Sequence, residues 1–223
     1  MSATPATPAM SAPSAASATD APSTPSAADA ADAALATSHG ASPARSVRLF
    51  FALWPDAATV RALNDWAGDA HALCGGRIMR PDTLHLTLAF LGDTAPELLP
   101  PLAREVQARR IEPGMVTLSR YGAFPRPRIV WAGPADTGNG NPDEGTARLT
   151  AEHQNLWNWV RPLHPARPEP HFRPHVTLLR NADTRELPPQ SPPPIAWRYD
   201  RYVLVASTQN GAARYRIVAS TKI

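Results

Sequence analysis

Two histidines in this sequence each precede a threonine by two positions, with aliphatic residues between and after. The two sets are His85-Leu86-Thr87-Leu88 and, ninety positions later, His175-Val176-Thr177-Leu178. Side chains alternate between the two faces of a β-strand. Each histidine is therefore expected to share a face with its threonine, while Leu84, Leu86, Leu88 and Phe90, like Val176 and Leu178, point into a core.

Two imidazoles that face one cleft can divide acid and base catalysis, because histidine titrates near pH 6.5. One would activate a water and the other protonate a leaving oxygen, each role contributing about 10²–10⁴ in rate. Neighbouring threonine hydroxyls can hold the non-bridging oxygens of a phosphate, and no metal is needed. The alternative is that both histidines are structural and both threonines simply favour strands. The matched copies favour the catalytic interpretation.

Other residues capable of chemistry lack a pattern that fits a known site. His164, His171 and His175 are separated by several prolines and match no standard metal-ligand spacing. The lone Cys74 excludes a disulfide framework and a cysteine-rich zinc site. We therefore predict an activity without a metal or a cofactor.

The elements around these motifs are read from hydrophobic periodicity and from breaker residues. A helix is expected from a cap at Asp56 to about residue 73, a second over about 95–110, and a third from Thr146 to about Leu163, with His153 on its apolar stripe. Strands are expected over 47–54, 84–91, 115–121, 129–132, 176–180, 202–207 and 215–220, the last two joined across Gln209-Asn210-Gly211. The mixed order predicts an α+β domain with a largely antiparallel sheet.

Composition divides the chain into two parts. Residues 1–45 hold 36 Ala, Ser, Pro and Thr residues and few large apolar side chains, so we expect a disordered tail before a domain spanning 46–223. The tail has no secretory signal pattern, and no apolar run approaches the ~18 residues of a membrane span. A cytoplasmic protein that does not enter the membrane is expected. All but one of its 22 basic residues are arginine, a residue suited to phosphate, although genomic base bias also explains this composition.

The motifs resemble those of the bacterial and archaeal RNA 2′,3′-cyclic phosphodiesterases, the LigT-like "2′-5′ RNA ligases" of the two-histidine phosphoesterase superfamily. The resemblance is carried by 48–52, 81–92, 122–125, 128–131, 172–178 and 204–207. It implies two pseudo-symmetric lobes of antiparallel sheet, with outer helices, around a central cleft. It also implies that His85 is the proton donor, that His175 is the proton acceptor, and that Thr87 and Thr177 bind phosphate oxygens. The substrate would be RNA with a 2′,3′-cyclic phosphate end, opened to a 2′-phosphate, with 2′-5′ ligation as the reverse reaction.

The same resemblance marks Arg180 as a residue near the substrate phosphate and Phe51 as an aromatic on which a base could stack. Strict alternation places Arg180 on the Val176 face, so it would need a bulge to reach the cleft, and a solvated edge arginine is the alternative. Phe51 shares its strand face with Val47, Leu49 and Leu53, which favours a core position.

Two alternative functions remain at this point. One is a phosphoesterase of the same fold that acts on a small cyclic nucleotide or an ADP-ribose cyclic phosphate, and the other is a non-catalytic RNA-binding module. The loops 133–145 and 181–194 look like insertions that could reshape the cleft entrance. No obligate protein partner is evident in the sequence.

Overall fold

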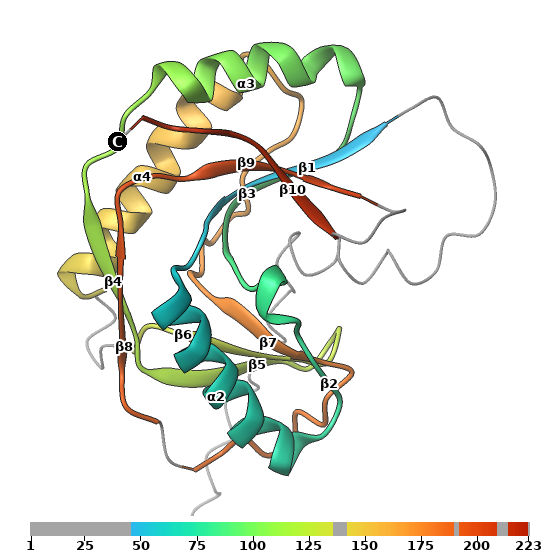
Figure 1. The fold of residues 1–223 in the computed structure, drawn as a ribbon, viewed down its shortest axis with the longest axis vertical. Helices are drawn as coiled ribbons and strands as arrows, with labels where there is room; N and C mark the ends of the chain where they lie inside the picture. The colour runs from blue at the N-terminus through green and yellow to red at the C-terminus, as the bar shows by residue number, and fades with distance from the viewer. Residues whose placement is uncertain (1–45, 136–141, 190–191, 209–213, 223) are drawn as a thin grey trace, which may run out of the picture.

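The computed structural model describes residues 46–135, 142–189, 192–208 and 214–222, and its strands and helices are shown in Figure 1. The strands are β1 Val47–Leu53, β2 Arg77–Ile78, β3 Leu86–Thr94, β4 Gly114–Leu118, β5 Arg120–Phe124, β6 Ile129–Gly133, β7 Val176–Arg180, β8 Ile195–Tyr199, β9 Val203–Ser207 and β10 Tyr215–Ser220. The helices are α2 Ala57–Cys74, α3 Leu99–Ala108 and α4 Glu144–Val160, with 3₁₀ turns at Pro81–Thr83 and Pro96–Leu98. Within these ranges no helix is long and apolar enough to cross a membrane.

The main sheet runs in the order β10-β9-β1-β3-β7-β6-β5, with β2 also paired to β7, and its pairs are antiparallel. Strands β10, β9, β1 and β3, with α3 and α4, form what we call the β1 lobe; strands β7, β6, β5 and β2, with α2, form the β7 lobe. The α+β class and the antiparallel sheet predicted from the sequence are confirmed. A second, two-stranded sheet pairs β4 with β8.

Each lobe is covered by a helix that follows a strand of the other lobe. Helix α2 follows β1 in the chain but packs on β7 and β6, and α4 follows β6 but packs on β3 and β4. Helix α3 lies over β10 and β9, so the helices lie outside the two half-sheets (Figure 1). This exchange gives the two lobes a common core that includes Leu63, Leu149, Leu86 and Val176.

Local sequence explains the helix ends. The Asp56 carboxylate accepts a hydrogen bond from the Thr59 N–H at 2.7 Å, and Asp143 accepts one from the Thr146 N–H at 2.8 Å, which places the N-caps of α2 and α4. The helix expected over about 95–110 is divided: a 3₁₀ turn spans 96–98, and α3 begins after it at Leu99. Prolines 100 and 101 consequently lie in the first turn of α3, where no backbone N–H is required.

The sequence analysis was wrong about two stretches. The strand expected over 115–121 divides at Ser119 into β4 and β5, which belong to different sheets. Strand β8 begins directly after the loop expected over 181–194, in a stretch for which no strand was predicted, although Ile195, Trp197 and Tyr199 alternate as buried residues with exposed neighbours. The tail over 1–45 and the turn Gln209-Asn210-Gly211 lie outside the described residues.

Both motif strands contain a β-bulge one residue after the motif threonine. In β3 the pairing with β1 skips Leu88, and in β7 the pairing with β6 skips Leu178. The residues after the bulges, Ala89 and Leu179, lie in the core beside Leu88 and Leu178. The side-chain alternation therefore shifts by one residue beyond each bulge.

The bulge in β3 corrects the face assigned to Phe90. Its ring packs with Phe50 and Ala52 on the face opposite the main core. This is the face of His85 and Thr87, because the Phe50 ring lies 4.8 Å from the His85 ring, centroid to centroid. Phe90 therefore points toward the motif side chains rather than into the core with Leu88.

Candidate active site

The two motif histidines are held by the same backbone contact. The ring Nδ1 of His85 lies 2.7 Å from the carbonyl oxygen of Thr83, and Nδ1 of His175 lies 2.8 Å from that of Arg173. A carbonyl oxygen only accepts hydrogen bonds, so each Nδ1 carries the proton and donates it. Nε2 is then the nitrogen through which each ring can give or take a proton, the arrangement that paired acid and base catalysis requires.

The histidines occupy equivalent places, each one residue before its strand. Strand β3 begins at Leu86 and β7 at Val176, and these two residues pair with each other across the two lobes. Continued by one residue in each direction, this antiparallel register places His85 opposite Thr177 and Thr87 opposite His175. In agreement, Thr87 and His175 line the same cavity, of about 40 Å³. Each motif histidine thus faces the threonine of the other motif.

His85 is enclosed by aromatic rings from the β1 lobe. The Trp54 indole stacks on the imidazole, with the planes 7° apart and the centroids 5.8 Å apart. The rings of Phe50 and Tyr215 lie at 4.8 Å and 5.4 Å, the latter edge to face. An aromatic face attracts a cation, so the Trp54 face would interact favourably with an imidazolium at this position.

His175 has different neighbours, in the β7 lobe. Its ring lies 5.2 Å from Phe124 and 6.0 Å from Trp131, centroid to centroid. Each of these rings already has a guanidinium over it, from Arg173 at 5.7 Å on Phe124 and from Arg120 at 4.9 Å on Trp131. The two motifs are therefore near mirror images in sequence but not in their surroundings.

Arg180 reaches the site side of β7 because of the bulge at Leu178. It pairs with Ile129, whose side chain packs with Phe124 and Trp131, and directly opposite residues of antiparallel strands share a face. Arg180 is 9% exposed, so the alternative of a solvated edge arginine does not hold. On its other side it pairs with Arg77 of β2, which adds a second guanidinium from the same face. The sequence analysis did not single out Arg77.

Phe51 does not lie at this site. Its side chain is fully buried in the main core, edge to face with Trp159 at 5.4 Å and with Tyr202 at 5.9 Å. Phe50, its neighbour on the opposite face of β1, is the aromatic residue that contacts His85. The alternation along 47–54 already separated these faces, so the signal for Phe50 and Trp54 was present in the sequence.

Two further histidines have structural partners. His153 is buried on α4, where its Nε2 accepts a hydrogen bond from the Trp157 indole N–H at 3.1 Å and its ring stacks on Phe172 at 4.0 Å. Burial lowers the pKa of His153 to about 4. His164 is buried between the Thr94 hydroxyl and the Ala166 N–H, each at 3.1 Å. The described residues contain no cluster of three or more His, Cys, Asp or Glu side chains that could hold a metal ion.

Comparisons with known proteins show which family this chain is similar to. Residues 53–131 match the family described as "LigT like Phosphoesterase". The chain is 33% identical over 179 residues to the "RNA 2′,3′-cyclic phosphodiesterase" of Escherichia coli K12, covering 75% of this chain and 92% of that protein. A protein of the same name from Thermus thermophilus is 31% identical, with 72% and 82% covered. The crystal structure of E. coli LigT complexed with NADP+ superposes with a TM-score of 0.60 at 26% identity, covering 79% of this chain and 97% of that one.

Proposed function

The chain belongs to the LigT-like phosphoesterase family, and we propose that it hydrolyses RNA 2′,3′-cyclic phosphate ends to 2′-phosphomonoesters through His85 and His175. The observation that carries the proposal is the pairing of Leu86 with Val176. It brings together two histidines whose Nδ1 atoms are held by backbone carbonyls, so that Nε2 of each is the atom that exchanges a proton. Because the substrate is RNA, we expect the protein to act in the cytoplasm.

The reaction is an in-line displacement at phosphorus. Nε2 of His175, as the base, takes a proton from a water while the water oxygen bonds to phosphorus. The bond from phosphorus to the ribose O3′ breaks, and O3′ receives a proton from Nε2 of His85. His85 must therefore begin as the imidazolium and His175 as the neutral ring. The products are a 2′-phosphate and a free 3′-hydroxyl, and proton exchange with solvent restores both histidines.

The surroundings of the two rings support this division of roles. The face of Trp54 stacks on His85, and an aromatic face attracts the cation that the proton donor must carry, whereas the rings beside His175 already have the guanidinium groups of Arg120 and Arg173 over them. The cavity that Thr87 and His175 line together with residues of β3, α4 and the segment 167–173 has a volume of about 40 Å³, which exceeds the roughly 10–15 Å³ that a water molecule needs. A water would then lie beside the base.

Thr87, Thr177 and Arg180 would stabilise the charge on the phosphate. Each threonine hydroxyl lies across from the histidine of the other motif, so the two hydroxyls flank a phosphate held between the imidazoles. Arg180 adds a guanidinium on the same face of β7, suited to the non-bridging oxygens. Hydrogen-bond donors aimed at developing charge typically contribute about 10²–10³ each.

The same site can also join RNA ends. An RNA 5′-hydroxyl in place of the water would give 2′-5′ ligation, with His175 again acting as the base on the attacking hydroxyl and His85 again protonating the leaving O3′. We propose ligation as a secondary activity, because water outcompetes an RNA end at ordinary concentrations. A small cyclic nucleotide or an ADP-ribose cyclic phosphate would use the same chemistry. A non-catalytic RNA-binding module would have no use for two imidazoles with matched Nδ1 contacts.

The test is hydrolysis of an RNA oligomer with a 2′,3′-cyclic phosphate end, in EDTA, by the full chain and by His85→Ala and His175→Ala. We expect a 2′-phosphate product that persists with chelator and falls by at least about 10² in each variant. His71→Ala, a change at an exposed histidine on α2, is the matched control and should keep full activity. Activity retained in either motif variant would contradict the proposal.

A substrate with a better leaving group separates the acid from the base. A nucleoside p-nitrophenyl phosphodiester releases a phenolate that needs little protonation, so it should restore turnover in His85→Ala far more than in His175→Ala. Equal restoration, or restoration of His175→Ala alone, would reverse the assignment.

A further inference from the structure

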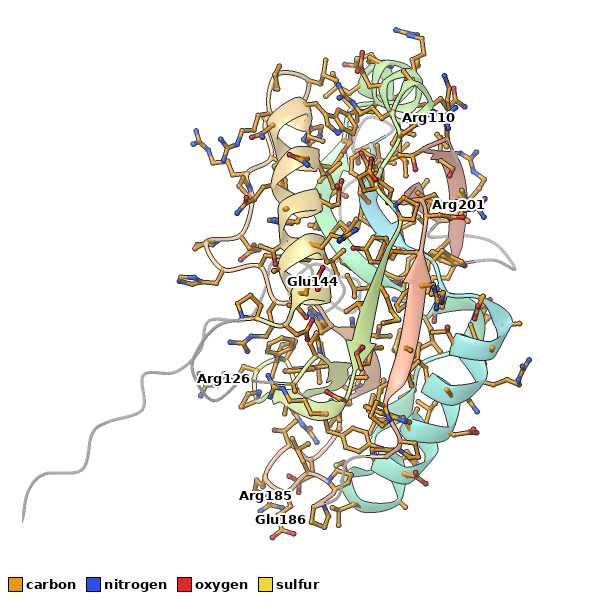
Figure 2. The ribbon with its side chains drawn as sticks, turned by 90° about the vertical axis from the view of Figure 1, so that its left-hand side faces the viewer. Arg110, Arg126, Glu144, Arg185, Glu186 and Arg201 are labelled. Atoms are coloured by element: carbon orange, nitrogen blue, oxygen red, sulfur yellow. The ribbon has the colours of Figure 1, made fainter. Side chains whose placement is uncertain are left out.

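A long groove adjoins the candidate active site at Trp54. It has a volume of about 1440 Å³ and runs from Trp54 and the start of α2 across the β4–β8 sheet to the start of α4. Figure 2 looks onto β4 and β8, with Glu144 at the start of α4 on one side and Arg201 on the other. Pockets that enclose one small ligand measure about 300–1,000 Å³, so this groove has room for more than one nucleotide.

The geometry of the displacement says which part of the substrate lies near Trp54. In an in-line reaction the water and the leaving O3′ lie on opposite sides of phosphorus. The base His175 marks the water side, so the ribose, and with it the rest of the RNA, lies on the side of the acid His85. Trp54 stacks on His85 and also lines the groove, which links the two spaces.

The groove wall is suited to nucleobases. Besides Trp54 it includes Val203, which packs with Phe50, and the exposed side chains of Ile217 and Met115. Ile217 is 47% exposed and Met115 41%, so half of the four large hydrophobic side chains exposed in the described ranges lie in this groove. Exposed apolar surface that gathers in one place marks a binding site, and bases stack on aromatic and apolar side chains.

Most charged side chains of the groove wall already have a partner within the protein, and one arginine is available to bind a phosphate. Glu144 pairs with Arg148 at 3.5 Å, and Asp200 pairs with Arg201 at 3.0 Å. The other two acids, Asp56 and Asp143, accept hydrogen bonds at the N-termini of their helices. Arg198, on the exposed side of β8, is the remaining charged residue of the wall. Because the acids of the wall outnumber its arginines, binding here depends on the bases more than on the phosphates.

We propose that this groove binds the RNA strand on the 5′ side of the cyclic phosphate, with a nucleobase on Trp54, further bases along Ile217 and a phosphate at Arg198. The inference rests on the proposed function and extends it, because it makes an oligomer, rather than a mononucleotide, the preferred substrate. Stacking is tolerant of sequence, so the preference is for length and not for particular bases.

The experiment compares kcat/KM for 2′,3′-cyclic AMP with that for oligoadenylates of increasing length ending in a 2′,3′-cyclic phosphate. In the unmodified full chain, kcat/KM should rise with the first added nucleotides. Trp54→Ala should reduce this gain by roughly 5- to 150-fold. Because Trp54 also touches His85, Ile217→Ser and Arg198→Ala test the groove away from the catalytic ring. Ile217→Ser should reduce the gain in kcat/KM with length. Arg198→Ala should make the slope of log(kcat/KM) for the oligomer against log salt concentration less negative by about 0.7.

Leu73→Ser is the matched control, because Leu73 is 50% exposed on α2 and lies outside the groove. It should keep the full gain with length. An equal kcat/KM for mononucleotide and oligomer, or a gain that survives both Ile217→Ser and Arg198→Ala, would overturn the inference. Light scattering tests whether a second copy of this chain occupies the groove instead. If the protein is a dimer that Ile217→Ser dissociates while the gain in kcat/KM with length is unchanged, the groove is an interface between copies of this chain and the inference is overturned.

Binding separates this inference from the proposed function. A labelled oligomer is titrated into His175→Ala and followed by fluorescence anisotropy, with and without Ile217→Ser. Affinity that rises with length and falls in the double variant supports the groove even if no cyclic phosphate is hydrolysed, whereas hydrolysis without any length effect supports the function alone.

Discussion

Leu86 pairs with Val176, and through this pair the β1 lobe meets the β7 lobe at the first residue of both motif strands. The pair sets the position of all four motif side chains, because antiparallel register fixes what lies opposite each residue. The two lobes therefore share a site in which each histidine faces the other motif's threonine. Because each half of the site contains a histidine from one motif and a threonine from the other, neither motif can form the site alone.

The first prediction concerns the threonines. Thr87→Val and Thr177→Val preserve shape and strand propensity but remove the hydroxyl. Each should lower kcat by roughly 10²–10³, with a smaller change in KM, because the hydroxyls act on charge that develops during the reaction. Single-turnover rates with a cyclic-phosphate oligomer measure this. A change confined to KM would show that the hydroxyls serve only ground-state binding.

Arg180 provides the second prediction. Arg180→Met keeps a long side chain in the buried position but removes the guanidinium, and kcat/KM should fall about 10- to 100-fold. Arg180→Lys should recover little, because a single ammonium cannot bind two phosphate oxygens in the planar manner of arginine. Circular dichroism and thermal melting serve as controls for folding. Full activity in Arg180→Met would show that Arg180 has only a structural role.

Neighbouring phenylalanines on opposite faces of β1 give a third, paired prediction. Phe51→Leu shortens a fully buried core ring and should lower the free energy of unfolding by roughly 1–2 kcal/mol, less than the 3–5 kcal/mol of a change to alanine, while kcat stays near normal. Phe50→Leu removes a ring that contacts His85 and should mainly lower kcat. Urea unfolding of both variants measures the change in stability, and steady-state kinetics measures the change in kcat. An activity loss in Phe51→Leu larger than in Phe50→Leu would contradict the face assignment.

The fourth prediction is a loss of stability in mild acid. Burial lowers the pKa of His153 to about 4, against about 6.5 in an unfolded chain, so the unfolded state binds more protons between these values. The free energy of unfolding should therefore fall as the pH drops from about 6.5 toward 4. Burial also lowers the pKa of His164, which acts in the same direction.

His153→Phe tests this directly, because phenylalanine retains the stack on Phe172 and does not titrate. Urea midpoints measured at several pH values should show a weaker acid dependence in His153→Phe than in the parent protein. Identical slopes would mean that His153 is not buried as a neutral ring in solution.

Sequence alone predicted the chemistry proposed for this protein and determined much of its local structure. Two copies of a histidine and threonine spaced for one strand face were enough to predict paired acid and base catalysis, because side-chain alternation is a local property of strands. The N-caps at Asp56 and Asp143 are also local features, because each carboxylate accepts a hydrogen bond from an N–H three residues later. The mixed order of strands and helices predicted the α+β class with an antiparallel sheet, which the structure confirms, and the family resemblance predicted its two lobes.

Only the tertiary structure decided which side chains accompany the histidines. The bulges at Leu88 and Leu178 arise from pairing with β1 and β6, strands distant in sequence, and they turn Phe90 and Arg180 toward the site against strict alternation. The pairing across the lobes placed Phe50 and Trp54 around one histidine and arginine-capped rings around the other. These ring contacts join each histidine to residues more than thirty positions away, so no local period could specify them, and they alone distinguish two motifs that are nearly identical in sequence.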